Sequence, residues 1–256
     1  MRGSFDEALA TVAPIVADVR ERGDEALLEW TSRFDGPRPS GIRVPAERLD
    51  AAQVDDDVLD ALRRMIKAVR RFSEAQRPAD TSVEAAPGIV SERRWLPLGA
   101  VGVCVPSGRQ PLPSSLVMTA VPALVAGVGR VAVVTPNPAD ATLVVARELG
   151  IDEVYAVGGA QAVAALAYGT ATVPPVHAIV GPGNAYVTAA KLLVASSALS
   201  VRSSASLSSP CSAWASRSAA TESAAAESSA ITTTSLGPAG RSMRTRLATR
   251  SLAAVT

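Results

Sequence analysis

The sequence predicts an α/β fold, in which a Rossmann-like parallel sheet is flanked by helices. Between residues 97 and 195, short apolar runs alternate with alanine-rich stretches of helical length, a pattern typical of β-α-β units. The apolar runs have no polar face, which indicates strands that are buried on both sides. A helical N-terminal segment precedes this region, and a poorly ordered C-terminal tail follows it.

We divide the chain into three parts on this basis: a helical N-terminal segment over 1–96, a Rossmann-like domain over 97–195, and a tail over 196–256. In the first part, apolar residues recur at helical spacing from Phe5 to Val19, and Gly23 ends that run. The other elements expected there are a helix from Asp24, a loop over 35–41, a short helix after Pro45, a helix from Asp57 to Phe72, and strands at 89–90 and 93–98.

The second part is predicted to begin with a buried strand. The elements expected in order are a strand over 100–105, a helix over 114–126, a strand over 130–135, a helix over 139–149, a strand near 154, a helix over 160–168, a strand over 177–180 and a helix from 185 to about 195. Right-handed crossovers would bring the carboxyl ends of these strands to one edge of the sheet.

The tail differs from the rest of the chain in composition. Residues 1–197 hold 19 Lys+Arg and 22 Asp+Glu, a net charge of −3, whereas residues 198–256 hold six Arg and two Glu, a net charge of +4. The tail has 15 Ser and few large apolar residues, so it cannot bury enough surface to offset its ordering entropy. Natural disorder and a slipped coding frame are both open explanations.

Composition and charge exclude several classes of function. The chain of 256 residues is 48% hydrophobic with a net charge of +1, which favours a globular protein with neither a nucleic-acid nor a membrane partner. No apolar run reaches the roughly 18 residues of a membrane span. Cys104 and Cys211 cannot form a disulfide framework, and no signal-like segment opens the chain. We therefore expect a cytoplasmic protein.

Two glycine-punctuated turns mark the candidate site. The turn at Gly158 follows a short apolar run, and so does the turn at Gly181; each leads into an alanine-rich helix. In parallel sheets such strand exits bind ligands, because glycine permits close approach and the next helix presents unpaired N–H groups. Gln161 and Asn184 place amides at these exits, which can both donate and accept hydrogen bonds. The alternative is that the glycines only form turns and the amides only cap helices.

Several motifs together resemble the N-terminal half of the histidinol dehydrogenase family. They are DVRERGDEALLEWTSRFDG at 18–36, the run over 97–106, PSSLVMTAVPALVAGV at 113–128, VGGAQAVAALAYGT at 157–170 and VGPGNAYVTAAK at 180–191. The resemblance covers about residues 5–195. It implies a zinc- and NAD-dependent homodimeric enzyme of histidine biosynthesis that oxidises L-histidinol, through the aldehyde, to L-histidine. It also implies that residues 1–96 belong to a first, incomplete α/β domain.

The resemblance implies three cofactor-binding positions for NAD. Gln161 in VGGAQ and Asn184 in GPGN match the family pattern, whereas Cys104 stands where the family has a tyrosine and Ser107 where it has a glycine. Loss of the tyrosine ring removes a stacking surface, and the added Cβ narrows the approach of a ligand. Cys104 could be a nucleophile, but we favour a small buried thiol, because nothing beside it in the sequence would lower its pKa.

No catalytic or metal-binding residue can be assigned. The family binds zinc through a QAEH-like motif and a later Asp and His, and it transfers protons through a Glu-His pair. This chain has one histidine, His177, at a position that is not a ligand in the family; we interpret it as structural. The chain as written is therefore expected to lack the zinc ligands and to be inactive.

A frameshift would explain the missing residues. Read one base earlier with permissible codons, residues 228–235 can encode a sequence close to the zinc motif, and the nucleotide sequence would test this. Two other functions stay open. Residues 108–112 are similar to the turn of sulfopropanediol-type dehydrogenases, which act on another polar alcohol, and the chain could instead be a non-catalytic nucleotide-binding module.

Overall fold

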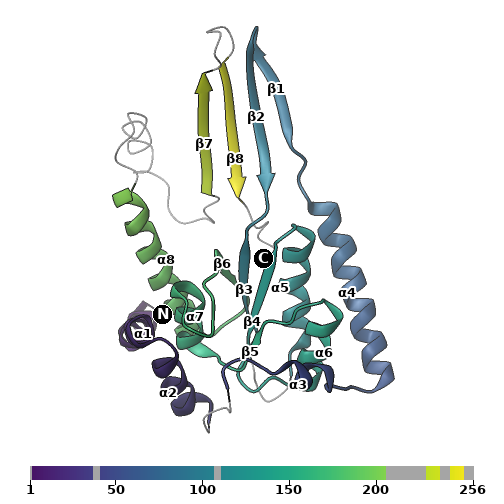
Figure 1. The fold of residues 1–256 in the computed structure, drawn as a ribbon, viewed down its shortest axis with the longest axis vertical. Helices are drawn as coiled ribbons and strands as arrows, with labels where there is room; N and C mark the ends of the chain where they lie inside the picture. Colours follow the sequence, from purple (N-terminus) through teal and green to yellow (C-terminus); the bar gives the residue numbers. More distant parts are fainter. Residues whose placement is uncertain (1, 37–40, 107–110, 206–228, 237–242, 251–256) are drawn as a thin grey trace.

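A computed structural model describes residues 2–36, 41–106, 111–205, 229–236 and 243–250. The predicted α/β architecture is confirmed: a parallel sheet lies between two groups of helices (Figure 1). Its strands are β3 (Ala100–Cys104), β4 (Arg130–Val134), β5 (Val154–Tyr155) and β6 (Ala178–Val180). All are paired in parallel in the order β5-β4-β3-β6.

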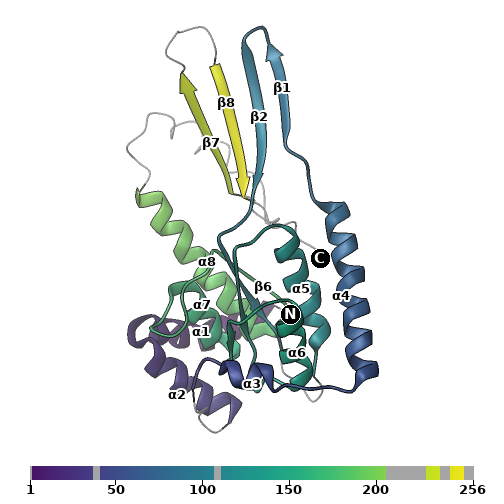
Figure 2. The same ribbon diagram turned by 45° about the vertical axis from the view of Figure 1, so that its right-hand side comes forward.

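The helices pack on the sheet through two hydrophobic cores. One core lies beneath α1 (Arg2–Arg22), α2 (Asp24–Asp35), α7 (Gly159–Tyr168) and α8 (Ala185–Ala205). The other lies beneath α3 (Ala46–Asp50), α4 (Asp56–Gln76), α5 (Pro113–Val125) and α6 (Asp140–Glu148). Figures 1 and 2 show these two groups on opposite sides of the parallel sheet. Every residue of β3 is buried, as expected for a strand covered on both faces.

The helices of the N-terminal segment pack into the two cores of the parallel-sheet domain. Val12 and Val19 of α1 are fully buried in the core that α7 and α8 share. The isolated bridge between Arg43 and Tyr155 joins the segment after α2 to β5. The first 36 residues therefore help to form the surface at the end of the sheet, where the candidate site lies.

A second sheet, in the order β1-β2-β8-β7, extends away from the helices (Figure 1). Its strands are β1 (Thr81–Ala86), β2 (Ile89–Leu96), β7 (Ser229–Leu236) and β8 (Met243–Arg250). β1 pairs with β2 as an antiparallel hairpin, and β8 lies parallel to β2 from Ile89 to Leu96. The sequence did not predict β1, and it predicted two short strands where β2 is continuous.

Residues 196–205, 229–236 and 243–250 are the described parts of the predicted tail. α8 continues past residue 195 to Ala205, and β7 and β8 form an antiparallel pair. β8 pairs with β7 on one side and with β2 on the other, so its backbone groups are satisfied within the second sheet. Residues 206–228, 237–242 and 251–256 of the predicted tail lie outside the described residues.

Candidate functional site

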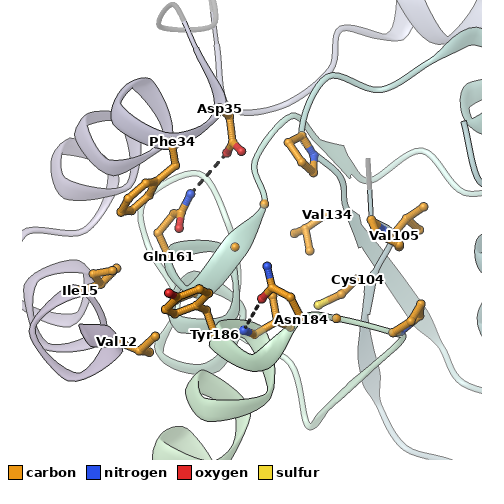
Figure 3. Close-up of a pocket in the computed structure, with 18 of the residues that line it drawn as sticks. Val12, Ile15, Phe34, Asp35, Cys104, Val105, Val134, Gln161, Asn184 and Tyr186 are labelled. Atoms are coloured by element: carbon orange, nitrogen blue, oxygen red, sulfur yellow. Dashed lines mark hydrogen bonds between the residues drawn. The ribbon is translucent and has the colours of Figure 1, made fainter. Parts of the chain in front are cut away.

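A cleft of about 690 Å³ opens at the carboxyl ends of the parallel strands (Figure 3). It brings together all three positions predicted to bind the cofactor: Cys104, Gln161 and Asn184. Cys104 ends β3, Gln161 lies in the first turn of α7, and Asn184 directly precedes α8. Residues that are separated by 80 positions in the sequence therefore meet at one edge of the sheet, as parallel topology requires.

The strand order explains why a cleft forms at this place. From β3 the chain moves outward through β4 to β5, and β6 then returns to the other side of β3. The connections on the two sides of β3 therefore diverge at its carboxyl end. In open α/β sheets such a switch point is the place where ligands bind.

The turn before α7 holds the Gln161 side chain in place. Gly159 has a φ of +67°, and a Cβ there would lie 2.6 Å from Gln161 Oε1. Glycine is thus required both for the backbone conformation and for the close approach of the amide. Gln161 is only 1% exposed, and its Nε2 donates to Asp35 Oδ2 at 3.4 Å. Its side chain therefore binds α2, in contrast to the alternative that both amides only cap helices.

The side-chain amide of Asn184 uses its oxygen to cap α8 and directs its nitrogen at the cleft. Its Oδ1 accepts a hydrogen bond from the Val187 N–H at 3.0 Å, and its carbonyl accepts from the Thr188 N–H. This is the arrangement of an N-cap residue. Figure 3 shows the amide nitrogen of Asn184 pointing into the cleft, away from the helix. The capping alternative is thus right for Oδ1 and leaves the amide nitrogen for a ligand.

Cys104 is buried where β3 ends. Burial raises the pKa of its thiol to about 11, and the positive charge of Lys191 opposes this shift. The thiol is therefore protonated at neutral pH and is a poor nucleophile. Lys191 is itself engaged, because its Nζ donates to the Gly181 carbonyl at 2.6 Å. The favoured interpretation of Cys104 as a small buried side chain agrees with this environment.

Sequence reasoning missed the part of the cleft that the N-terminal helices supply. Asp35 is half-buried at the end of α2, and burial raises the pKa of its carboxyl. Phe34 beside it is 54% exposed and stacks on Trp30 with ring centroids 5.5 Å apart, while Tyr186 on α8 is 49% exposed. One signal was present in the sequence: an acidic residue in the last turn of a helix opposes the helix dipole.

His177 lies away from the cleft, at the amino end of β6. The His177 Nδ1 accepts a hydrogen bond from the Ala100 N–H at 3.1 Å, and the backbone N–H of His177 donates to the Ala100 carbonyl. This agrees with its interpretation as a structural residue. In the described ranges no three His, Cys, Asp or Glu side chains are grouped so that they could hold a metal ion. The described residues therefore do not fit a zinc site. Ser107, where the family has a glycine, lies outside the described residues.

None of the helices in the described part of the chain is long and apolar enough to cross a membrane.

The fold and the cleft define an α/β protein with a cleft at the switch point of its parallel sheet. The model of the histidinol dehydrogenase family matches residues 2–228, and the chain belongs to this family. The resemblance seen in the sequence is thus confirmed, and the match extends beyond the residue 195 expected as its end. The family consists of oxidoreductases of histidine biosynthesis, which in general use NAD and zinc.

The relatives show how much of the family's length is present. The histidinol dehydrogenase of Deinococcus radiodurans is 52% identical over 199 residues, which cover 75% of this chain and 45% of the relative. That of Mycobacterium bovis is 48% identical over 208 residues, covering 75% and 47%. The crystal structure of histidinol dehydrogenase from Elizabethkingia anophelis has a TM-score of 0.68 at 30% identity, covering 73% of this chain and 45% of that one. The chain spans about half the length of the curated relatives it matches.

Proposed function

We propose that this chain is the NAD-binding half of a histidinol dehydrogenase homologue. The observation that carries this proposal is that Cys104, Gln161 and Asn184 line one cleft at the carboxyl ends of β3, β5 and β6. In the complete enzyme the cleft would serve the oxidation of L-histidinol to L-histidine, in a cytoplasmic homodimer. NAD supplies the hydride acceptor for that reaction when it is bound.

The residues of the cleft fit a dinucleotide. A volume of about 690 Å³ lies within the range of about 300 to 1,000 Å³ that small-molecule sites occupy. The amino ends of α7 and α8 begin at the cleft, so their unpaired N–H groups suit a pyrophosphate. Asn184 Nδ2 can donate to a ribose or a carboxamide, and the exposed ring of Tyr186 provides an apolar surface for a base.

The proposal separates cofactor binding from turnover. General acid-base catalysis and zinc coordination in the family need histidines, and the whole sequence has only His177. That residue is engaged at the amino end of β3, at the opposite edge of the sheet from the cleft. We therefore propose that the chain alone binds NAD without oxidising an alcohol, whichever alcohol the complete enzyme uses.

Calorimetry with NAD tests the binding half of this proposal. We expect saturable binding by the full chain, and we expect Gln161→Ala to weaken it about tenfold, the effect of losing a buried polar contact. Gln76→Ala is the matched control, because Gln76 is an exposed amide at the end of α4, outside the cleft. Absence of binding by the unaltered chain would refute the proposal.

A turnover assay tests the second half. The chain, supplied with L-histidinol, NAD and zinc, is expected to form no NADH, whereas a full-length member of the family assayed in parallel does. Formation of NADH by the chain alone would show that its catalytic groups have been misassigned. A sulfonated diol in the same assay covers the alternative substrate suggested by residues 108–112, of which 108–110 lie outside the described residues.

A further inference from the structure

Asp35 is a carboxylate in the wall of the cleft, beside the positions proposed to bind NAD. It is the last residue of α2 and lies next to Gly36, and Figure 3 shows its side chain directed toward Gln161. Gln161 Nε2 donates to Asp35 Oδ2 at 3.4 Å. Burial raises the pKa of this carboxyl, and no cation in the described part of the chain contributes to the shift.

This carboxylate is costly for the folded chain. A half-buried charge that lacks a cationic partner loses hydration without an ion pair to replace it. Asp35 also lies at the carboxyl end of a helix, where the helix dipole is unfavourable to negative charge. The amide of Gln161 supplies one neutral donor, but a carboxylate can accept about four hydrogen bonds. The cleft therefore holds an acceptor that is suited to donors from a ligand.

The surroundings of Asp35 indicate which donors these are. Phe34, the preceding residue, is 54% exposed and lines the cleft, and its ring stacks on that of Trp30. A flat apolar surface beside an acceptor suits a planar base joined to a sugar that carries hydroxyl groups. Neighbouring hydroxyls of a ribose can donate to the two oxygens of one carboxylate.

We propose that Asp35 is a specificity-determining residue that accepts a hydrogen bond from the 2′-hydroxyl of the adenosine ribose and excludes nucleotides phosphorylated there. This rests on the proposed function, because it assigns one contact within the proposed NAD site. A 2′-phosphate would remove the donor and place a second negative group beside the carboxylate. Both effects favour NAD over NADP.

Calorimetry with NAD and NADP on the full chain tests this proposal. The unaltered chain should bind NADP at least about tenfold more weakly than NAD. The reason is that losing one hydrogen bond to a charged group weakens affinity by about tenfold or more. Asp35→Asn keeps the size and removes the charge, and it should reduce that preference by about tenfold. Asp35→Ala provides a second variant. Asp50→Asn, which removes one charge on α3 outside the cleft, should leave the preference unchanged.

The outcomes separate this inference from the function on which it rests. If the unaltered chain binds neither nucleotide, the NAD site itself is refuted, and Asp35 with it. If NAD binds but NADP binds equally well, only the role of Asp35 is overturned. The same conclusion follows if both Asp35 variants, verified as folded by circular dichroism, weaken NAD and NADP by the same factor.

Discussion

Gly181 lies directly against the backbone of Cys104. A Cβ on Gly181 would be 2.2 Å from the Cys104 carbonyl oxygen, and Gly181 has a φ of +109°. The segment that follows β6 therefore leaves the sheet by passing over the last residue of β3. This contact places Asn184 and Cys104 at the same cleft, and it depends on a residue without a side chain.

Gly181→Ala is expected to destabilise the chain strongly. The positive φ costs about 1 to 2 kcal/mol for a residue with a Cβ, and the contact with backbone atoms adds about 1 to 3 kcal/mol, because the backbone must shift. Gly150→Ala is the matched control: its φ is +70°, but a Cβ there meets nothing within 4 Å. Urea unfolding should show the larger loss for Gly181→Ala, and equal losses would contradict the close contact.

Two substitutions at Asn184 should separate capping from ligand binding. Asn184→Asp keeps an oxygen for the Val187 N–H, so the free energy of unfolding should change little, whereas Asn184→Ala should lose about 1 kcal/mol. Both remove the amide nitrogen that points into the cleft, so both should weaken NAD binding. Unfolding curves and NAD calorimetry on the same two samples check this; unchanged NAD affinity in Asn184→Asp would show that the amide contacts no cofactor.

The stability of the chain should decrease at alkaline pH because of Cys104. The pKa of its thiol is about 11 in the folded chain, compared with an ordinary value of 9.0. As the pH rises past 9, the unfolded chain releases this proton first, so the stabilisation present below pH 9 is lost up to about pH 11. Over these two pH units the loss should be about 3 kcal/mol, at about 1.4 kcal/mol per pH unit.

Cys104→Ala is the control for this pH dependence. The variant has no thiol at this position, and the other groups that titrate in the same range, such as Tyr155 with a pKa of about 12, contribute equally to both chains. The difference in unfolding free energy between the two chains should therefore become smaller as the pH rises. A difference that stays constant would show that the thiol titrates normally in the folded chain.

Arg147 connects the N-terminal segment to the parallel-sheet domain. Its Nη1 donates to the carbonyls of Leu49, Asp50 and Ala52 at 3.1, 2.7 and 3.0 Å. This side chain of α6 thus supplies a hydrogen-bond donor to the carbonyl groups at the end of α3. Arg147→Met should cost about 1 to 3 kcal/mol, because partly buried carbonyls lose a charged donor. Arg64→Met, at an exposed position on α4, should change stability far less.

Hydrogen exchange would locate the effect of Arg147→Met. Amides of α3 and of the segment around Ala52 should exchange faster in this variant than in Arg64→Met, while those of β3 and β4 should stay protected. Uniformly faster exchange would instead indicate that Arg147 supports the whole fold.

Much of the local structure could be predicted from the sequence. The alternation of apolar and helical stretches predicted every strand of the parallel sheet, because strands buried on both faces need continuous apolar runs. The glycine turns before Gln161 and Asn184 identified two of the cleft residues, because turn chemistry is local. The hairpin strand β1 was missed because all of its residues are exposed, so it has no apolar pattern to detect.

Pairing of distant segments required the tertiary structure. The contact between Asp35 and Gln161 joins residues 126 positions apart, and no local pattern relates the end of α2 to the start of α7. The same holds for β8, which lies beside β2 through backbone hydrogen bonds that are largely independent of side chains.

The sequence by itself therefore determined the helices and strands of the α/β core, and it identified Gln161 and Asn184 as amides at the edge of the sheet. Only the tertiary structure decided the strand order β5-β4-β3-β6 and the surfaces that close the cleft. The physical reason is that periodicity and turn preference act over a few residues. The position of α1 and α2 against α7 and α8, by contrast, is set by the joint burial of side chains from all four helices.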